Sequence, residues 1–141
     1  QTIALNGMHL TDNLNNPTKW MFPAVSLAAD DFLIVWCDED GSQGPLHANF
    51  QLAAGGEDVG LFDTLPLGVG LIDTVHFGQQ TNDVSFGRFP DGGSWRVLAV
   101  PTPGESNGTI GVGADGDRIA VVWSALLRDT AMRWGCASHV E

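Results

Sequence analysis

The residues best suited to metal chemistry lie in one acidic turn. Asp38, Glu39 and Asp40 follow one another and precede Gly41. Ca²⁺ prefers hard oxygen ligands supplied by flexible loops, and carboxylates provide them. Three consecutive carboxylates do not all point at one centre, however, and an Asp–Gly pair by itself forms a turn after a strand. Asp38, Glu39 and Asp40 are therefore weak calcium candidates with a solvated turn as the alternative, and we expect no other cofactor.

The histidines and serines do not form the spacings that catalysis or zinc binding needs. The four histidines show no His-x-x-x-His pattern, and there is no Cys-x-x-Cys pair. Ser85 and Ser94 lie outside any nucleophile-elbow motif. We expect no catalytic residues and no enzyme. His47 is expected to bond loop backbone and so set the geometry before Phe50.

Three side chains are candidates for binding. Trp134 has Arg133 beside it, and an exposed Trp with a neighbouring Arg is typical of an interface anchor. The alternative is that Trp134 covers one end of the fold. Arg88 carries a planar fork that suits turn carbonyls or a carboxylate such as Asp91, and an anionic ligand is the alternative.

The two cysteines, Cys37 and Cys136, allow one internal disulfide. It would close a loop of about 100 residues and stabilise the fold by about 4 to 5 kcal/mol in the chain-entropy account. The alternative is that Cys37, inside an apolar run, is a small buried residue.

Length and charge exclude several classes of function. The chain has 141 residues, which is one domain, and its 17 acidic against 6 basic residues give a net charge of -11. Such a charge opposes nucleic acids and anionic membranes. No stretch approaches the roughly 18 apolar residues of a membrane span. We therefore expect neither nucleic-acid binding nor membrane insertion.

The secondary structure around these residues is predicted to consist of β-strands. Residues 32–37 form an apolar run typical of a central strand buried on both faces, and residues 71–77 alternate with Val75 and Phe77 toward the core. Residues 84–86 and 95–100 flank an Asp-Gly-Gly turn and predict a hairpin. Shorter strands are predicted at 2–5, 8–11, 20–22 and 59–62. This pattern predicts an all-β sandwich.

The end of the chain differs from the rest. Residues 101–108 hold two prolines and no apolar side chain, which is typical of a connector. Residues 118–124 predict a further buried strand after a turn. Residues 125–139 fit either a hairpin or a short helix, and we favour the hairpin because the rest of the chain is β.

Several short stretches resemble a known family. They are GMHLTDN at 7–13, NPTKWMFP at 16–23, VWCDEDG at 35–41, GPLHANF at 44–50, GGEDVGLFD at 55–63, SFGRFPDG at 85–92 and PTPG at 101–104. In this order they resemble the lamin-tail domain family in its bacterial form. The resemblance implies an immunoglobulin-like β-sandwich over 1–104 that lacks the family's first strand. The extension 105–141 would complete that sandwich or pair with a partner chain, since open sheet edges invite pairing.

The resemblance implies a non-catalytic interaction or structural module. Nuclear members bind proteins and chromatin, but the charge of -11 weighs against a chromatin role here. We expect protein contacts, including a homodimer formed through the incomplete sheet edge. Bacterial copies resemble accessory modules of secreted or surface proteins, so an extracellular or cell-surface location is expected, with the cytoplasm as the alternative. The alternative function is a carbohydrate or cell-surface binding module, with or without bound Ca²⁺.

Overall fold

The computed structural model describes residues 2–82, 84–108, 124–126, 132–133 and 136–137. Within these residues the regular structure consists of β-strands and two short 3₁₀ turns, which confirms the predicted all-β class. The strands are β1 (Ile3–Ala4), β2 (His9–Thr11), β3 (Trp20–Met21), β4 (Ser26–Leu27), β5 (Ile34–Cys37), β6 (His47–Ala48), β7 (Glu57–Phe62), β8 (Leu71–Phe77), β9 (Ser85–Phe89), β10 (Ser94–Leu98), β11 (Ser124–Leu126), β12 (Met132–Arg133) and β13 (Cys136–Ala137). No helix in the described part of the chain is long and apolar enough to cross a membrane.

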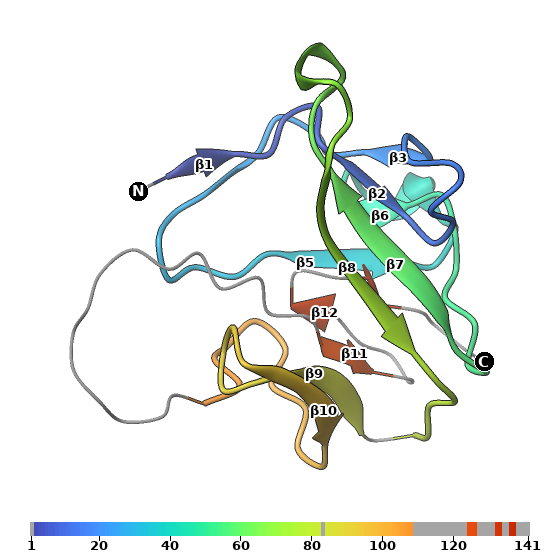
Figure 1. The fold of residues 1–141 in the computed structure, drawn as a ribbon, viewed down its shortest axis with the longest axis vertical. Helices are drawn as coiled ribbons and strands as arrows, with labels where there is room; N and C mark the ends of the chain where they lie inside the picture. Colours follow the sequence, from blue (N-terminus) through green and yellow to red (C-terminus); the bar gives the residue numbers. More distant parts are fainter. Residues whose placement is uncertain (1, 83, 109–123, 127–131, 134–135, 138–141) are drawn as a thin grey trace.

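The longest strands belong to an antiparallel sheet with the order β3-β2-β7-β8 (Figure 1). β7 and β8 form a hairpin in which Val59 pairs with Val75. Val75 and Phe77 are both buried, as the alternation in the sequence predicts. The strands predicted at 8–11, 20–22 and 59–62 correspond to β2, β3 and β7.

β5 forms the centre of the layer that faces this sheet. It pairs with β12, β6 and β13, which confirms that the apolar run is a central strand. Burial along β5 alternates: Val35 and Cys37 are buried, whereas Ile34 and Trp36 are half-buried. The prediction of burial on both faces is therefore wrong, because only one face of β5 meets the core.

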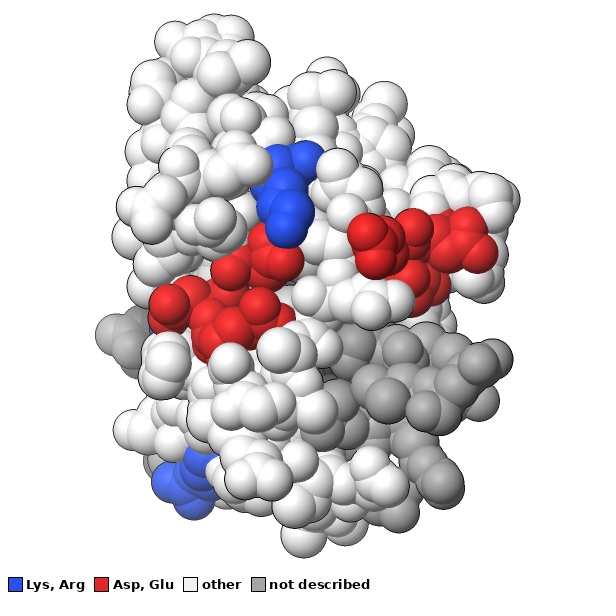
Figure 2. Space-filling model, turned by 90° about the vertical axis from the view of Figure 1, so that its right-hand side faces the viewer, with Lys and Arg blue, Asp and Glu red and all other residues white. Residues whose placement is uncertain are grey.

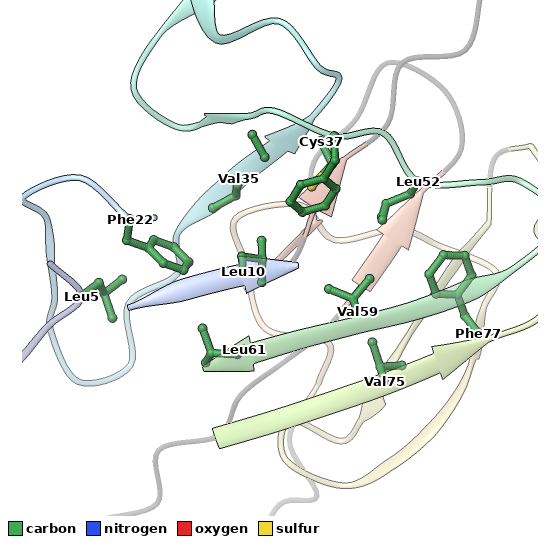
Figure 3. Packing of buried hydrophobic residues seen from close by; sticks show 12 residues of the cluster. Leu5, Leu10, Phe22, Val35, Cys37, Leu52, Val59, Leu61, Val75 and Phe77 are labelled. Carbon is green, nitrogen blue, oxygen red and sulfur yellow. The ribbon is translucent and has the colours of Figure 1, made fainter. Parts of the chain in front are cut away.

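The hydrophobic core lies between β5 and the sheet that contains β2, β7 and β8. Figure 3 shows Leu10, Val59 and Leu61 pointing across this space toward Val35 and Cys37. The cluster also contains Leu5, Phe22, Ala48, Phe50, Leu52, Val75 and Phe77. Two layers joined by interdigitating apolar side chains are the arrangement of a β-sandwich. Each fully buried aliphatic or aromatic side chain stabilises it by about 1.5 to 3 kcal/mol.

A second hairpin, formed by β9 and β10, lies beside this core. Arg88 pairs with Trp95 across the two strands, and the Asp91 to Gly93 turn joins them, so the predicted hairpin is confirmed. The short strand predicted at 2–5 appears as β1, which pairs with β4. β4 and β6 have two residues each, too few to leave a periodic pattern in the sequence.

Beyond residue 108, the described pieces of the C-terminal extension are strands that pair within the chain. β11 pairs with β9, and β12 and β13 pair with β5. The strand predicted at 118–124 lies outside the described residues except for Ser124, the first residue of β11. The division at residue 104 stays a prediction.

Candidate functional site

A loop of exposed apolar residues joins β7 to β8. From Thr64 to Ile72 the sequence contains no charged residue. Leu65, Leu67 and Leu71 are 62%, 71% and 53% exposed, and Ile72 is 45% exposed. Residues 64–72, called the apolar tip below, project beyond the sheet at the top of Figure 1. Contiguous exposed apolar surface of this kind marks interaction sites.

Backbone interactions give the apolar tip a defined shape. Leu65–Leu67 form a 3₁₀ turn that contains Pro66. The amide of Gly68, whose φ is +91°, donates to the Leu65 carbonyl at 3.0 Å. Val69 has a φ of +52°, which is rare and strained for a β-branched residue. The Asp63 amide donates to the Gly70 carbonyl at 2.8 Å and closes the loop. The leucines are thus held outward by a structured turn.

Arg88 lies near the base of the apolar tip and binds Asp73 of β8. One terminal nitrogen donates to both carboxylate oxygens, at 3.1 and 3.2 Å, and the other donates to the Gly93 carbonyl at 3.2 Å. The guanidinium also lies 4.4 Å from the centre of the Trp95 ring. The expected contact to a turn carbonyl is present, whereas the carboxylate is Asp73 and not Asp91. Arg88 joins β9 to β8 across 15 residues of sequence.

Asp91 instead holds the connector that follows β10. Its carboxylate accepts from the Asn107 amide at 2.8 Å and from the Ser106 hydroxyl. The Asn107 side chain donates to the Arg88 carbonyl at 2.8 Å and accepts from Thr102 at 2.6 Å. Asn107 is only 7% exposed. The burial of Asn107 could not be predicted from the sequence, because a Pro- and Gly-rich connector shows no hydrophobic periodicity.

The acidic turn is bonded to its own loop. Asp38 Oδ2 lies 2.7 Å from His47 Nδ1, and Trp36 stacks on the His47 ring. His47 thus contacts a carboxylate where loop backbone was expected. Asp40 accepts hydrogen bonds from Ser42 and Gln43, and these bonds hold its pKa below the ordinary value.

No three metal-ligating side chains come together within the part of the chain that the structure describes. Glu39 lies between Asp38 and Asp40 in the same turn, and its backbone is in the left-handed region with a φ of +60°. Calcium binding by these three residues stays a prediction, tested by the change in melting temperature on adding Ca²⁺.

A second acidic region lies around the start of β7. Lys19 Nζ is 2.6 and 2.8 Å from the two carboxylate oxygens of Asp12. The pKa of Glu57 is raised, first by burial and then by the negative charges of Asp12 and Asp58. Figure 2 shows acidic side chains gathered on this face of the molecule with a basic side chain above one group.

The remaining predicted residues belong to the C-terminal segment. Cys37 is disulfide-bonded, and the sequence holds one other cysteine, Cys136. Cys136 is placed in β13 and Arg133 in β12, but their side chains are outside the described part. Trp134 lies outside the described residues, so its role as an anchor stays a prediction.

No family model, curated protein or solved structure matches the chain.

Proposed function

We propose that this chain is a non-catalytic interaction module that contacts proteins, including a second copy of itself, through the apolar tip. The observation that carries the proposal is the exposure of four large aliphatic side chains within residues 65–72. Removing apolar surface from water is worth about 25 cal/mol per Å². The exposed parts of Leu65 and Leu67, 62% and 71% of these residues, stay in contact with water in the folded monomer, so their burial is available for association.

Charge favours contact at the apolar tip over contact elsewhere between two copies. Each chain carries a net charge of -11, so two copies repel each other over most of their surface. The apolar tip has no charge of its own. Of the two acidic residues that flank it, Asp73 is paired with Arg88, and the Asp63 carboxylate accepts a hydrogen bond from the Thr64 amide. Two tips that meet about a twofold axis would form an isologous contact with little like-charge repulsion. Because the tip is small, we expect a weak dimer.

The proposal keeps the lamin-tail resemblance and the immunoglobulin-like sandwich that it implies. Two face-to-face layers of strands support that architecture. The expected contact through an incomplete sheet edge is replaced here by contact through the apolar tip. The reason is that β11, β12 and β13 pair with β9 and β5 of the same chain.

Sedimentation velocity over a range of protein concentrations tests this proposal. Leu67→Asp places a charge on the apolar tip, where Leu67 is 71% exposed, and Val97→Asp places the same charge on an aliphatic position of β10 that is 62% exposed. We expect the wild type and Val97→Asp to form dimers as concentration rises and Leu67→Asp to stay monomeric. A monomeric wild type, or equal dimerisation of both variants, would overturn the proposal.

A further inference from the structure

The sequence contains two Asn–Gly pairs, Asn6–Gly7 and Asn107–Gly108. In such a pair the glycine nitrogen can attack the side-chain carbonyl carbon of the asparagine. Ammonia leaves, a cyclic imide forms, and water opens the imide to aspartate or isoaspartate. Glycine favours the reaction because it has no Cβ and its backbone turns freely, and asparagine is a thermolabile residue for this reason. The two pairs have the same intrinsic chemistry, so their environments decide which one reacts.

Asn6 and Gly7 occupy an open turn between β1 and β2. Asn6 is exposed, and the Met8 amide donates to the Leu5 carbonyl at 2.9 Å to close the turn. Gly7 has a φ of +81°, and its amide is 3.4 Å from the Phe22 carbonyl, a long hydrogen bond. The Asn6 side chain is therefore in solvent, next to a glycine nitrogen that is only weakly held.

Asn107 and Gly108 occupy the opposite kind of environment. The Asn107 amide group is buried and is fixed at both ends, to the Arg88 carbonyl and the Thr102 hydroxyl. Its own backbone amide donates to Asp91, and the Gly108 amide donates to Ser106 Oγ at 3.1 Å. The attack needs the amide group to rotate toward the Gly108 nitrogen. These bonds must open first.

We propose that Asn6 deamidates spontaneously in the folded protein while Asn107 is protected, and that the new carboxylate weakens contacts made by the apolar tip. The turn lies against the base of that tip, since a Cβ at Gly7 would be 3.6 Å from Thr64 Cγ2. Deamidation replaces a neutral amide with a negative charge on the residue before Gly7, and so in the turn that contacts the segment two copies would bring together. The weakening of contacts at the apolar tip rests on the proposed function, whereas the deamidation itself does not.

Peptide mapping by mass spectrometry tests the modification. The intact protein is aged in buffer, and a parallel sample is aged in denaturant, where both pairs should react at similar rates. In the folded sample we expect the Asn6 peptide to gain the mass of an amide-to-acid exchange. The Asn107 peptide should react more than about tenfold more slowly, the factor given by about 1.4 kcal/mol of local opening. Equal rates at the two sites in the folded protein, or no reaction at Asn6, would overturn the proposal.

Two variants test the effect of the new charge on dimerisation separately from the deamidation of Asn6. Asn6→Asp mimics the product, and Asn6→Gln keeps a neutral amide. Sedimentation velocity should show weaker dimerisation for Asn6→Asp than for Asn6→Gln. Equal dimerisation of these variants, together with a wild type that dimerises, would overturn the effect on the tip. A wild type that stays monomeric would overturn the proposed function and this effect together, and the peptide map would still decide the fate of Asn6.

Discussion

The paired strands and the connecting loop of the β7–β8 hairpin place the same residue types in opposite environments. In the paired strands Leu61, Val75 and Phe77 are at most 4% exposed, whereas Leu65 and Leu67 in the loop are more than half exposed. The hairpin is longer than the core that covers it. Leucine in the buried part of the hairpin stabilises the fold. The leucines of the apolar tip are mostly exposed to water, so their hydrophobicity is better explained by contact with another molecule.

Asp73 lies at the boundary between the buried part of the strands and the exposed apolar tip. It pairs with Leu61 across the hairpin and binds Arg88 from β9. Beyond it the register shifts between Leu61 and Phe62, which bends the strands where the buried part stops. An ion pair therefore lies where the apolar contacts of the core give way to solvent.

The largest effect is expected in the buried part. Leu61→Ala removes a side chain that is 1% exposed and should lower the free energy of unfolding by about 2 to 5 kcal/mol. Urea unfolding with a two-state fit measures it. A loss below that range would mean that the core around β7 is loosely packed and would break the comparison.

The boundary should give an intermediate effect. Arg88→Ala removes the two hydrogen bonds that the guanidinium donates to Asp73 and should cost about 1.5 to 3 kcal/mol, as for hydrogen bonds to charged groups. Arg88→Lys should recover only part of this, because lysine lacks the planar fork. Arg96→Ala, at an exposed position of β10, is the matched control: it removes a cation–π contact with the Phe89 ring, 5.2 Å away, and should cost no more than about 1 kcal/mol. Unchanged stability in Arg88→Ala with loss of an anionic ligand would support the ligand-binding alternative.

The sequence predicted the parts of this comparison that depend on periodicity. The alternation in residues 71–77 identified Val75 and Phe77 as core, and the Asp-Gly-Gly turn identified the second hairpin. The sequence did not identify the apolar tip. The extent of the opposing layer determines which residues of the hairpin are buried, and the local sequence pattern carries no information on that extent.

The polar partners were harder to predict than the strands. Arg88 was identified as a turn-fixing residue, but its carboxylate lies 15 residues away on another hairpin. Likewise His47 meets Asp38 through the return of the chain after the acidic turn. The residue type predicts that a half-buried Arg or His side chain is hydrogen-bonded, whereas the identity of its partner depends on the tertiary structure.

A smaller, pH-dependent effect is expected at the far end of the hairpin, where Glu57 pairs with Phe77. Burial raises the pKa of Glu57, so the folded state holds its proton more tightly than the unfolded state. Stability should therefore fall as pH rises through the raised pKa, and the ionised group should destabilise the fold above it.

Glu57→Gln tests this sign. Glutamine keeps an oxygen that can accept the Ala53 amide, as Glu57 does, without the charge. The variant should be more stable than the wild type well above the ordinary carboxylate range and should lose that advantage well below it. Urea unfolding at one pH on each side measures the difference. A gain that is the same at both pH values would contradict the role of ionisation.

The smallest effect on stability is expected in the apolar tip. Leu65→Ser and Leu67→Ser should each change the free energy of unfolding by no more than about 0.5 kcal/mol, as for exposed positions away from special features. Thermal and urea unfolding of both variants check this. A loss close to that of Leu61→Ala would show that the tip leucines pack inside the monomer, and the comparison would fail.

Cross-linking at the apolar tip shows directly whether two copies of the chain meet there. Leu67→Cys places a thiol in the tip, and Val97→Cys places one at a similarly exposed position of β10. Under mild oxidation the account predicts rapid formation of a covalent dimer by Leu67→Cys and slow formation by Val97→Cys, because only the tips meet in the dimer. Equal rates for the two variants, or faster cross-linking at position 97, would contradict the claim that the apolar tip is the contact surface.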